Sequence, residues 1–412
     1  MGERVDTVVI GGGQAGLSAS HFLGRAGREH LVLERDRVGE RWRSGVWDSF
    51  TLVTPNWTLR LPEFAYDGDD PDGFLGKDDV VAYLEAFARK VDPPLRTGVE
   101  VTAVRGDDAA DVFTLETTDG TLRARNVILA TGTFRHPHRP AAADDLPRDL
   151  HQVHASAYRN PDALPDGAVL VVGSGQSGTQ IADDLVRSGR RTYLSVGRAP
   201  RLPRRYRGKD LFWWATTLGI FDRTPDQLES LAERFAPHPQ LTGRDGGRSL
   251  DLHALARDGV TLLGRFQGAG DDRLQFAPDL HETLARIDQG VAEFQRNVDG
   301  AVAKMDLDVP PPNEHENPVL RDGYDEPLRT ELGMREAGLA AVVWATGYRH
   351  DFSWVEPLPL DDWNYPDQRR GVSDVPGLYL TGLHWMHTQK SGLFYGLAGD
   401  TEHVTDHLLA HR

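Results

Sequence analysis

Two glycine-rich hexapeptides are the parts of this chain best suited to chemistry with a phosphate group. Each has the form G-x-G-x-x-G, and they run from Gly11 to Gly16 and from Gly173 to Gly178. In such a turn the first glycine permits the bend, the second lets a pyrophosphate approach the backbone, and the third allows close packing of the following helix. The phosphates then bind the free N–H groups at the start of that helix. The alternative is that either turn is an ordinary glycine loop. The candidate phosphate-binding residues are Gly11, Gly13, Gln14, Ala15, Gly16, Gly173, Ser174, Gly175, Gln176, Ser177 and Gly178.

The residues that end the next strand distinguish the two predicted nucleotides. Glu34 stands at this place after the first turn, and a carboxylate accepts hydrogen bonds from a ribose diol but repels a 2′-phosphate. This site therefore suits FAD or NAD. The corresponding stretch after the second turn, 195–201, contains no acidic residue. Ser195 and Arg198 in this stretch favour a 2′-phosphate, and hence NADPH. The alternative is that Arg198 and the arginines after it form a solvated basic stretch.

Predicted elements place both hexapeptides between a strand and a helix. Around the first turn we expect strands at 7–10 and 30–33 and a helix ending near 25, and around the second turn strands at 168–172 and 192–196 and a helix through 185. This order is the βαβ unit of a parallel sheet. Periodicity also predicts helices at 77–90, 279–305 and 401–409 and strands at 99–104, 112–117, 121–129 and 340–344.

The fold class that follows is α/β, with two Rossmann-like dinucleotide-binding domains, one inserted into the other. The first domain comprises about 1–160 and 326–412, and the inserted domain about 161–325. Within the inserted domain, the segment 206–258 fits neither βαβ unit and carries the aromatic cluster Phe212-Trp213-Trp214. We interpret it as a helical lid or substrate wall, and the alternative is an ordinary hydrophobic patch on an inserted helix pair.

Composition excludes several classes of function. The chain has 412 residues, and 62 acidic against 46 basic side chains give a formal charge of −16, which disfavours nucleic acid and anionic membrane surfaces as partners. There are no cysteines, so disulfides, thiolate metal sites and a redox-active cysteine pair are excluded. No apolar run is long enough to span a bilayer, and the N-terminus lacks the apolar region of a signal peptide, so we expect a cytoplasmic protein. No histidine cluster has the spacing of a metal site.

Several further motifs resemble those of a known family. The loop 39–55, which includes Trp42-Arg43, Trp47-Asp48 and Thr54-Pro55, is similar to the flavin-contacting loop of the class B flavoprotein monooxygenases, the group of the flavin-containing monooxygenases and the plant YUCCA enzymes. The segments 130–132 and 345–348 resemble the two places where the chain of this family passes between cofactor domains. The identifying string of the family is matched at its end by His154 and Tyr158, but Arg148 and Leu150 replace its Phe and Gly.

This resemblance implies that the first domain binds FAD and that the inserted domain binds NADPH. It also implies contacts to the cofactors from the C-terminal segment 381–393, where a helix beginning near Ser391 would aim N–H groups at the flavin. The further candidate cofactor-binding residues are Arg35, Arg41, Trp42, Trp47, Thr54, Val101, Ala130, Thr131, Gly132, Ala345, Thr346, Gly347, Tyr348, Gly382, Ser391 and Gly392.

The chemistry that the resemblance implies is NADPH-dependent oxygenation of a small molecule, at sulfur or nitrogen, through a flavin peroxide. Asn56 is the candidate catalytic residue, as a neutral donor facing the flavin, and the alternative is a plain turn residue. Partners would be a small-molecule substrate and molecular oxygen, with a homodimer as a possible assembly. A second hypothesis is a reductase or oxidase that passes electrons from NAD(P)H through FAD to a quinone, a protein partner or oxygen. A third is a non-catalytic FAD-binding scaffold.

Overall fold

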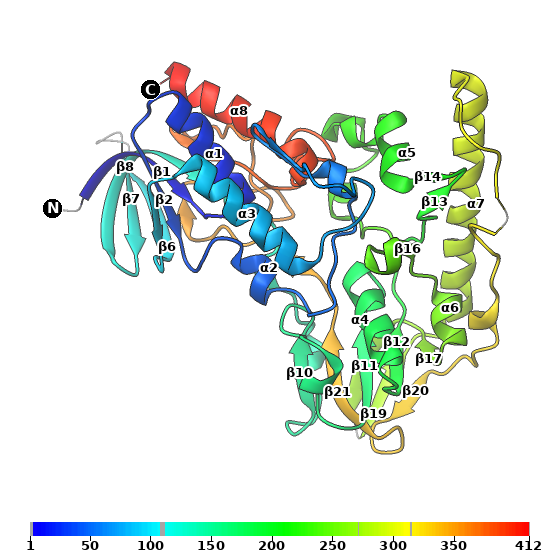
Figure 1. The fold of residues 1–412 in the computed structure, drawn as a ribbon. Helices are drawn as coiled ribbons and strands as arrows, with labels where there is room; N and C mark the ends of the chain where they lie inside the picture. The colour runs from blue at the N-terminus through cyan, green and yellow to red at the C-terminus, as the bar shows by residue number, and fades with distance from the viewer. Residues whose placement is uncertain (1–2, 108–111, 271, 314, 412) are drawn as a thin grey trace.

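Two β-sheets form the framework of the molecule, one in each of two lobes (Figure 1). The computed structural model describes residues 3–107, 112–270, 272–313 and 315–411. The first lobe is built from both ends of the chain, whereas the second is built from its middle (Figure 1). The predicted fold class, in which one dinucleotide domain interrupts another, is therefore confirmed.

The sheet of the first lobe has eight strands in the order β23-β6-β7-β8-β1-β2-β5, with β24 also paired to β8. Strand β8 pairs with two different strands along one edge. Its residues Gly120–Ala124 pair antiparallel with β7, and Val127–Leu129 pair parallel with β24. The strands are β1 (Glu3–Ile10), β2 (His30–Glu34), β5 (Leu95–Thr97), β6 (Val101–Asp107), β7 (Val112–Thr117), β8 (Gly120–Leu129), β23 (Val355–Glu356) and β24 (Leu378–Leu380).

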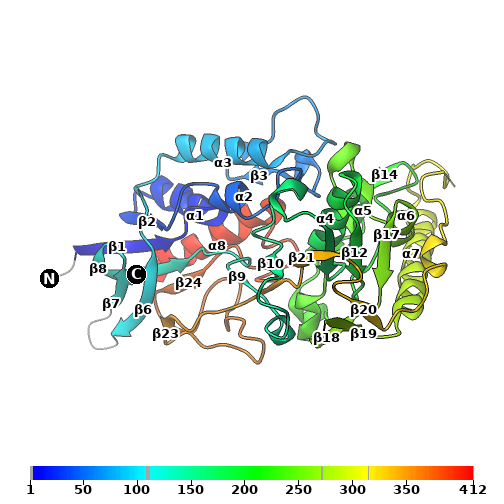
Figure 2. The same ribbon diagram turned by 90° about the horizontal axis from the view of Figure 1, so that it is seen from below.

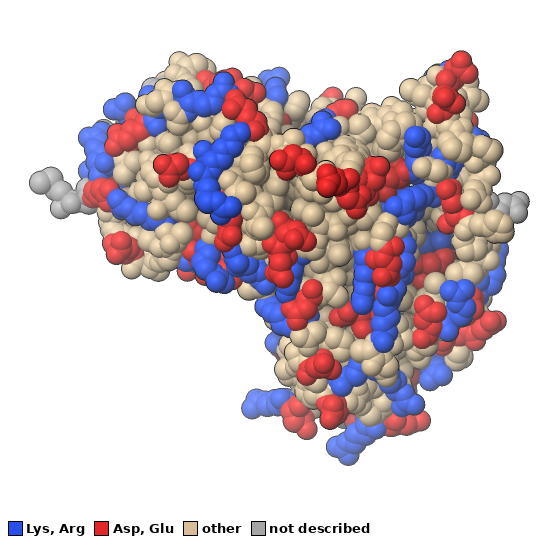
Figure 3. All heavy atoms as spheres, in the orientation of Figure 1, with Lys and Arg blue, Asp and Glu red and all other residues tan. Residues whose placement is uncertain are grey.

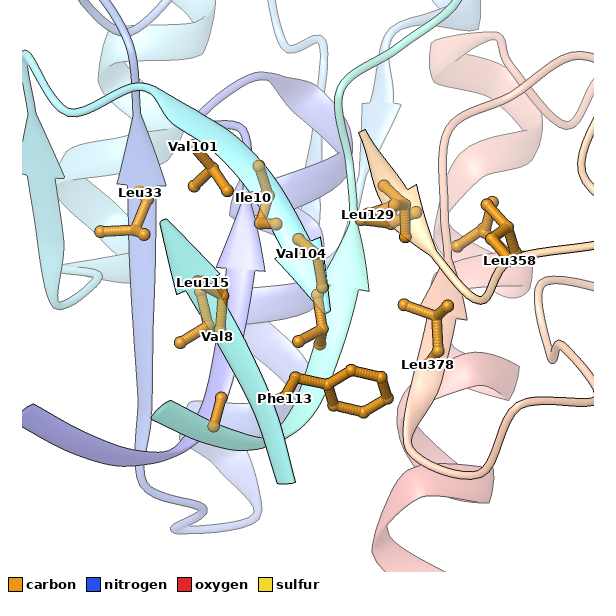
Figure 4. Packing of buried hydrophobic residues seen from close by; sticks show 14 of the residues in the cluster. Val8, Ile10, Leu33, Val101, Val104, Phe113, Leu115, Leu129, Leu358 and Leu378 are labelled. Carbon is orange, nitrogen blue, oxygen red and sulfur yellow. The ribbon is translucent and has the colours of Figure 1, made fainter. Parts of the chain in front are cut away.

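Alternate side chains of this sheet enter two different cores. Val8 and Ile10 of β1 pack toward the antiparallel strands, against Phe113 and Leu115 of β7 (Figure 4). Val9 points to the opposite face, into a cluster formed with three helices. These helices are α1 (Gln14–Arg25), α3 (Lys77–Val91) and α8 (Phe394–His411), and they lie together on one side of the sheet (Figure 1). The sheet is thus buried on both faces, which fixes the edge where the first glycine turn follows β1.

The sheet of the second lobe is parallel throughout, in the order β10-β21-β11-β12-β17. Its strands are β10 (His151–His154), β11 (Ala168–Val172), β12 (Thr192–Ser195), β17 (Val260–Leu263) and β21 (Leu339–Trp344). Two of these, β10 and β21, lie outside the predicted range 161–325, so the sheet extends beyond both predicted domain boundaries. The physical reason is that β11 needs a partner on each edge, and the apolar strand β21 supplies one of them.

The second lobe repeats the layering of the first. Helices α4 (Gln176–Arg187), α6 (Leu252–Arg257) and α7 (Leu280–Met305) cover one face of its sheet. The antiparallel strands β18 (Phe266–Gly270), β19 (Arg273–Phe276) and β20 (Glu331–Gly333) cover the other. The shorter elements include α2 (Glu40–Ser44), α5 (Leu211–Thr217) and the strand pairs β3 (Arg60–Leu61) with β4 (Phe64–Ala65), β13 (Arg205–Tyr206) with β14 (Lys209–Asp210), and β15 (Leu241–Thr242) with β16 (Arg248–Ser249).

Two chain crossings join the lobes and run side by side. Strand β9 (His136–Pro137) follows the first crossing and pairs antiparallel with β22 (Tyr348–Arg349), which follows the second. Figure 2 shows β9 at the junction between the lobes. The lobes are therefore connected by a short two-stranded link.

Acidic and basic side chains are interspersed over both lobes on the face shown in Figure 3. Within the described part of the chain, no helix is both long and apolar enough to cross a membrane.

Candidate functional site

The first glycine turn has the geometry of a nucleotide-binding turn. Gly11 adopts φ 114°, and a Cβ built there would lie 2.5 Å from the carbonyl oxygen of Ala130. A Cβ on Gly16 would lie 1.8 Å from the carbonyl oxygen of Gly11, so only glycine lets α1 pack so closely on the turn. A Cβ on Gly13 would meet nothing within 4 Å. The backbone of Gly13 therefore faces space in which a pyrophosphate fits.

The end of α1 nearest this turn is free to bind an anion. Gly13 is the N-cap residue, and no side chain caps the helix. The carboxylate of Glu34, at the end of β2, accepts hydrogen bonds from the backbone N–H groups of Gly12 at 2.6 Å and Asp36 at 2.8 Å. This arrangement holds an acceptor beside the turn, as a ribose diol requires. The residues of the first turn thus fit FAD.

The C-terminal segment returns to this turn, as the sequence predicts. Gly382 adopts φ 79°, and a Cβ on it would lie 2.6 Å from the Cβ of Ala15. The side-chain Nε2 of Gln14 donates to the carbonyl oxygen of Gly392 at 3.0 Å. Ser391 is buried, and its hydroxyl accepts from the backbone N–H of Thr388 at 2.9 Å. The following helix α8 begins at Phe394, three residues after the predicted start.

The second glycine turn repeats the first almost atom for atom. Gly173 adopts φ 103°, and its Cβ would lie 2.6 Å from the carbonyl oxygen of Ala345. A Cβ on Gly178 would lie 1.8 Å from the carbonyl oxygen of Gly173. Gly175 is the N-cap residue of α4, without a side-chain cap, and a Cβ there would meet nothing within 4 Å. The second turn therefore also fits a pyrophosphate.

A pocket of about 200 Å³ lies beside the second turn. Gly173, Ser195, Arg265 and Thr346 are among the residues that line it. Arg198 follows β12 with an exposed side chain and makes no ion pair with any described residue. Arg265, which sequence reasoning missed, is also exposed, with a long contact of 3.7 Å to Asp279. Two cationic side chains are thus available near this pocket.

The hydroxyl of Ser195, a predicted phosphate partner, already has two partners in the fold. Ser195 is 2% exposed, its hydroxyl donates to the carbonyl oxygen of Gly264 at 3.0 Å, and it accepts from the backbone N–H of Phe266 at 2.9 Å. Because these bonds tie β12 to the chain after β17, the hydroxyl is committed to the fold. Ser174, another predicted member of this site, is buried, and its hydroxyl accepts a hydrogen bond from the backbone N–H of Gly197 at 2.9 Å.

The arginines after Arg198 do not form a solvated stretch. Arg201 is buried and pairs with Asp251 at 2.7 Å. Arg204 is 3% exposed, pairs with Asp210 at 2.7 Å and donates to the carbonyl oxygen of Val53 at 2.6 Å. Burial lowers the pKa of Arg204 to about 10, against the opposing effect of Asp210. These side chains fasten the segment 200–210 to the fold, whereas Arg198 has no ion-pair partner in the described part of the chain.

The two predicted crossing motifs lie against the two glycine turns. The carbonyl oxygens of Ala130 and Ala345 face the first glycine of each turn, and the chain then continues into the paired strands β9 and β22. Arg41 donates to the hydroxyl of Tyr348 at 2.7 Å, and its guanidinium lies 5.1 Å from the centre of that ring. The ring of His154 bonds the carbonyl oxygen of Gly347 at 3.0 Å. Thr131, Gly132 and Thr346 belong to the same junction.

The motif residues His154 and Tyr158 join segments of the fold. Burial lowers the pKa of His154 below its usual range. The hydroxyl of Tyr158 donates to Asp184 of α4 at 2.9 Å, and Asp184 also accepts from Ser49 at 2.7 Å. These contacts fasten the loop 46–50 to the second lobe.

Asn56 has structural partners for both polar atoms of its side chain. It is 2% exposed, its Nδ2 donates to the carbonyl oxygen of Asp70 at 2.9 Å, and its Oδ1 accepts from the N–H of Leu75 at 2.8 Å. Asn56 begins the short helix η1 (Asn56–Thr58), so the turn role is supported. One hydrogen of the Nδ2 group has no partner among the described residues.

Several other predicted residues lie away from the two turns. Trp47 is buried in the core of the second lobe, and Val101 in the core beneath the first sheet. Trp42 stacks on Phe394 with ring centres 6.1 Å apart, beside the return segment. Thr54 lies half-buried in the loop before Asn56, and Arg35 is an exposed residue paired with Asp36 at 2.9 Å. Of these, the structure places Trp42 next to a segment that reaches the first turn.

The segment 206–258 bridges the lobes. Gln389 donates its backbone N–H to the carbonyl oxygen of Arg223 at 3.0 Å, and Lys390 forms an ion pair with Asp222. Arg234 pairs with Asp361 at 2.6 Å. The predicted lid residue Trp214 is instead fully buried, in a cluster with Val298 of α7, so for this side chain the hydrophobic-patch alternative holds.

Sequence reasoning also missed the loop that rests on the second turn. Gln240 is fully buried, and its Nε2 donates to the carbonyl oxygen of Ser174 at 2.7 Å. His238 lies two residues earlier, and its ring is 5.7 Å from that of His384 in the return segment. Periodicity carries no signal for such a loop. His384, however, lies inside the segment 381–393 that the sequence already associates with the first site.

Comparison with known proteins assigns the family. A family model described as pyridine nucleotide-disulphide oxidoreductase matches residues 8–209, although the chain has no cysteine with which to form a disulfide. An uncharacterized CzcO-like oxidoreductase of Geobacillus kaustophilus is 31% identical over 99% of both chains. Indole-3-pyruvate monooxygenase YUCCA1 of Oryza sativa subsp. japonica is 31% identical over 91% of this chain and 86% of that one.

A solved structure shares the fold. The flavin-containing monooxygenase from Stenotrophomonas maltophilia superimposes with a TM-score of 0.66 over 99% of both chains, at 21% identity. The two nucleotide turns, their order in the chain and these relatives all indicate the same family. The chain belongs to the class B flavoprotein monooxygenases, a family of oxidoreductases that use FAD and NADPH.

Proposed function

We propose that this protein oxygenates a small molecule at sulfur or nitrogen, with NADPH as reductant, FAD as the redox centre and a flavin peroxide as the oxygenating species. The observation that carries the proposal is the pair of equivalent open turns, at Gly13 and Gly175, in a chain without cysteine. We propose that electrons pass from the second site to the first, and a chain without cysteine cannot pass them on to a cysteine pair. Molecular oxygen is the acceptor that we propose.

The residues of the chain supply binding, orientation and exclusion of water, while FAD supplies the redox chemistry when it is bound. We propose that the N-terminus of α1 and Glu34 hold FAD, and that the return segment 381–393 closes over its ring end. The contact of Gln14 with Gly392 supports this, because it ties that segment to the turn. Asn56 keeps one amide hydrogen for the flavin, and a neutral amide can donate without transferring a proton.

For NADPH we propose that Arg198 and Arg265 bind the 2′-phosphate. Arg198 is exposed and unpaired within the described ranges, and Arg265 lines the pocket beside the second turn. Arginine–phosphate hydrogen bonds are among the stronger charge-assisted contacts in proteins. Neither arginine is needed to neutralise a buried carboxylate of the fold.

The direct test is to mix enzyme, reduced anaerobically with NADPH, with oxygenated buffer and to record flavin absorbance. The proposal predicts a long-lived peroxyflavin spectrum in the absence of substrate. Its decay should then be accelerated by a substrate from a panel of thioethers, tertiary amines and indole-3-pyruvate, the acid for which the rice relative is named. Product analysis of the accelerating compound distinguishes oxygenation at sulfur or nitrogen from attack at a carbonyl group.

The second candidate function is a reductase or oxidase. The Arg148 and Leu150 departures from the identifying string favour it. In that case the same experiment would show direct return to oxidised flavin with stoichiometric hydrogen peroxide. The search would then turn to quinones and protein acceptors.

A further inference from the structure

The fourth residue of each hexapeptide is a glutamine, and its side chain contacts a loop from elsewhere in the chain. In the first turn this residue is Gln14, whose Nε2 donates to the carbonyl oxygen of Gly392 at 3.0 Å. In the second turn it is Gln176, whose Nε2 lies 3.4 Å from the carbonyl oxygen of Pro239. The second loop is held further by Gln240, which donates to Ser174. Each glycine turn therefore carries its own docked loop.

Both docked loops present a histidine, and the two rings meet. His384 belongs to the loop on the first turn, and His238 to the loop on the second, with ring centres 5.7 Å apart. A Cβ on Gly392 would lie 2.8 Å from Nδ1 of His384, so glycine at that position makes room for the imidazole. The pair thus joins the loop docked on the first turn to the loop docked on the second.

The hydrogen-bonding groups of this pair are unused. Among the described residues, no ring nitrogen of His238 or His384 has a hydrogen-bond partner. Burial, with smaller contributions from His238 and His350, lowers the pKa of His384 to about 3. His238 is an exposed residue, but its ring packs on that of His384, and desolvation of the ring lowers its pKa as well. Both imidazoles are therefore uncharged at neutral pH, and each offers one N–H donor and one nitrogen acceptor.

Two other roles fit the pair less well. The described residues contain no group of three or more metal-ligating side chains that could hold an ion. An uncharged pair also attracts an anion weakly, compared with the arginines beside the second turn. A carboxamide, by contrast, has a carbonyl acceptor and an amino donor, which match two neutral imidazoles. Phe134, 45% exposed and with its ring 5.6 Å from that of His384, adds an aromatic wall for a planar ring.

We propose that His238 and His384 bind the carboxamide of the nicotinamide ring, and so hold the reducing end of NADPH between the two nucleotide turns. This inference rests on the proposal that the second turn binds NADPH. Neither histidine is required for binding the adenosine end of the nucleotide, which Arg198, Arg265 and the turn itself would hold. Substitution of either histidine should therefore weaken binding of the nicotinamide end of the cofactor and not of the adenosine end.

The test compares two ligands on the FAD-loaded protein by isothermal titration calorimetry. NADP⁺ contains the nicotinamide, whereas adenosine 2′,5′-bisphosphate lacks it. We expect His238→Leu and His384→Leu each to weaken NADP⁺ binding by about three- to tenfold, the loss of a single hydrogen bond, with the bisphosphate affinity unchanged. His238→Gln and His384→Gln keep a donor and an acceptor and should recover most of the affinity. The matched control is His151→Leu, at an exposed position of β10.

Two outcomes would overturn the proposal. Unchanged NADP⁺ affinity in both leucine variants would show that the pair faces another ligand, such as the substrate. Equal weakening of both ligands would show that the histidines only support the fold of the second site. Failure of the proposed function is distinguishable, because wild-type protein would then bind neither ligand. Flavin absorbance of each variant, and the glutamine variants if a leucine variant fails to fold, keep the comparison interpretable.

Discussion

The two glycine turns differ in one bond, although their backbones are almost equivalent. In the first turn the N–H of Gly12 donates to the carboxylate of Glu34, which ends the second strand of its unit. In the second turn the equivalent residue is Ser174, whose hydroxyl accepts from the N–H of Gly197, just beyond the corresponding strand. The direction of the bond is reversed. A carboxylate therefore stands at the first site and none at the second.

The proposed assignment of FAD to the first turn and NADPH to the second rests on this difference. The packing of turn against helix is fixed by Gly16 and Gly178, and it is the same in both lobes. The end of the second strand takes no part in this packing, and its contacts differ between the two lobes. An acidic side chain there suits a ribose diol, and its absence beside exposed arginines suits a 2′-phosphate. Specificity is thus separated from the structural part of the motif.

The largest expected effect comes from breaking one turn at a time. Gly16→Val would force a side chain into the carbonyl of Gly11 and should yield protein without flavin. Gly178→Val should yield yellow protein that fails to bind NADP⁺. Flavin absorbance and calorimetry measure both. Gly24→Ala is the matched control, because it lies in α1 and a Cβ there meets nothing within 4 Å. Loss of flavin in Gly178→Val with NADP⁺ binding intact would reverse the assignment of the two sites.

The next largest effect is expected when the carboxylate of Glu34, which distinguishes the two turns, is removed. Glu34→Ala leaves the N–H groups of Gly12 and Asp36 without their acceptor and also removes the proposed ribose contact. Hydrogen bonds to charged groups contribute about 1.5–3 kcal/mol, so FAD affinity should fall by about 10- to 100-fold. Fluorescence titration of the apoprotein with FAD measures this. NADP⁺ affinity should not change, and a parallel loss of it would indicate that Glu34 stabilises the whole fold.

At the second site we expect a change in the preference for one nicotinamide cofactor over the other. Arg198→Ala and Arg265→Ala should each reduce the preference for NADPH over NADH by about tenfold, because each removes a charge-assisted contact to the 2′-phosphate. Rates of flavin reduction under anaerobic conditions give the preference. Turnover with NADH should stay constant. If both variants keep the wild-type preference, the phosphate lies elsewhere.

Asn56 should show a moderate effect on stability. Asn56→Ala leaves the N–H of Leu75 without its acceptor and should lower the free energy of unfolding by about 1–3 kcal/mol. Urea denaturation of the FAD-loaded protein measures this. Unchanged stability would contradict the structural role. Loss of peroxyflavin lifetime at equal stability would instead identify the remaining amide hydrogen as a catalytic donor.

The smallest expected effect is the pH dependence of stability that His384 confers. The folded state keeps this imidazole neutral, and the unfolded state binds a proton below about pH 6.5. Stability should therefore fall as the pH decreases, by at most about 1.4 kcal/mol at pH 5.5. His384→Gln should flatten this slope in urea titrations at pH 7.5 and 5.5. An identical slope in the variant would show that other groups dominate.

The sequence was sufficient to locate both turns, because glycine spacing and flanking apolar strands are local signals. It could not show that the hydroxyl of Ser195 bonds to the chain after β17, because that contact is distant in sequence. It also could not assign β10 and β21 to the second sheet, since strand pairing is not encoded within either strand. Trp47 illustrates the same limit, because its motif resembles a flavin loop while its side chain packs in the other lobe.

Anaerobic reduction shows whether the two turns hold FAD and NADPH as one electron path. Purified protein should be yellow, and NADPH should bleach its absorbance near 450 nm faster than NADH does. Flavin that NADPH leaves oxidised, or protein that binds no flavin at all, would contradict the account.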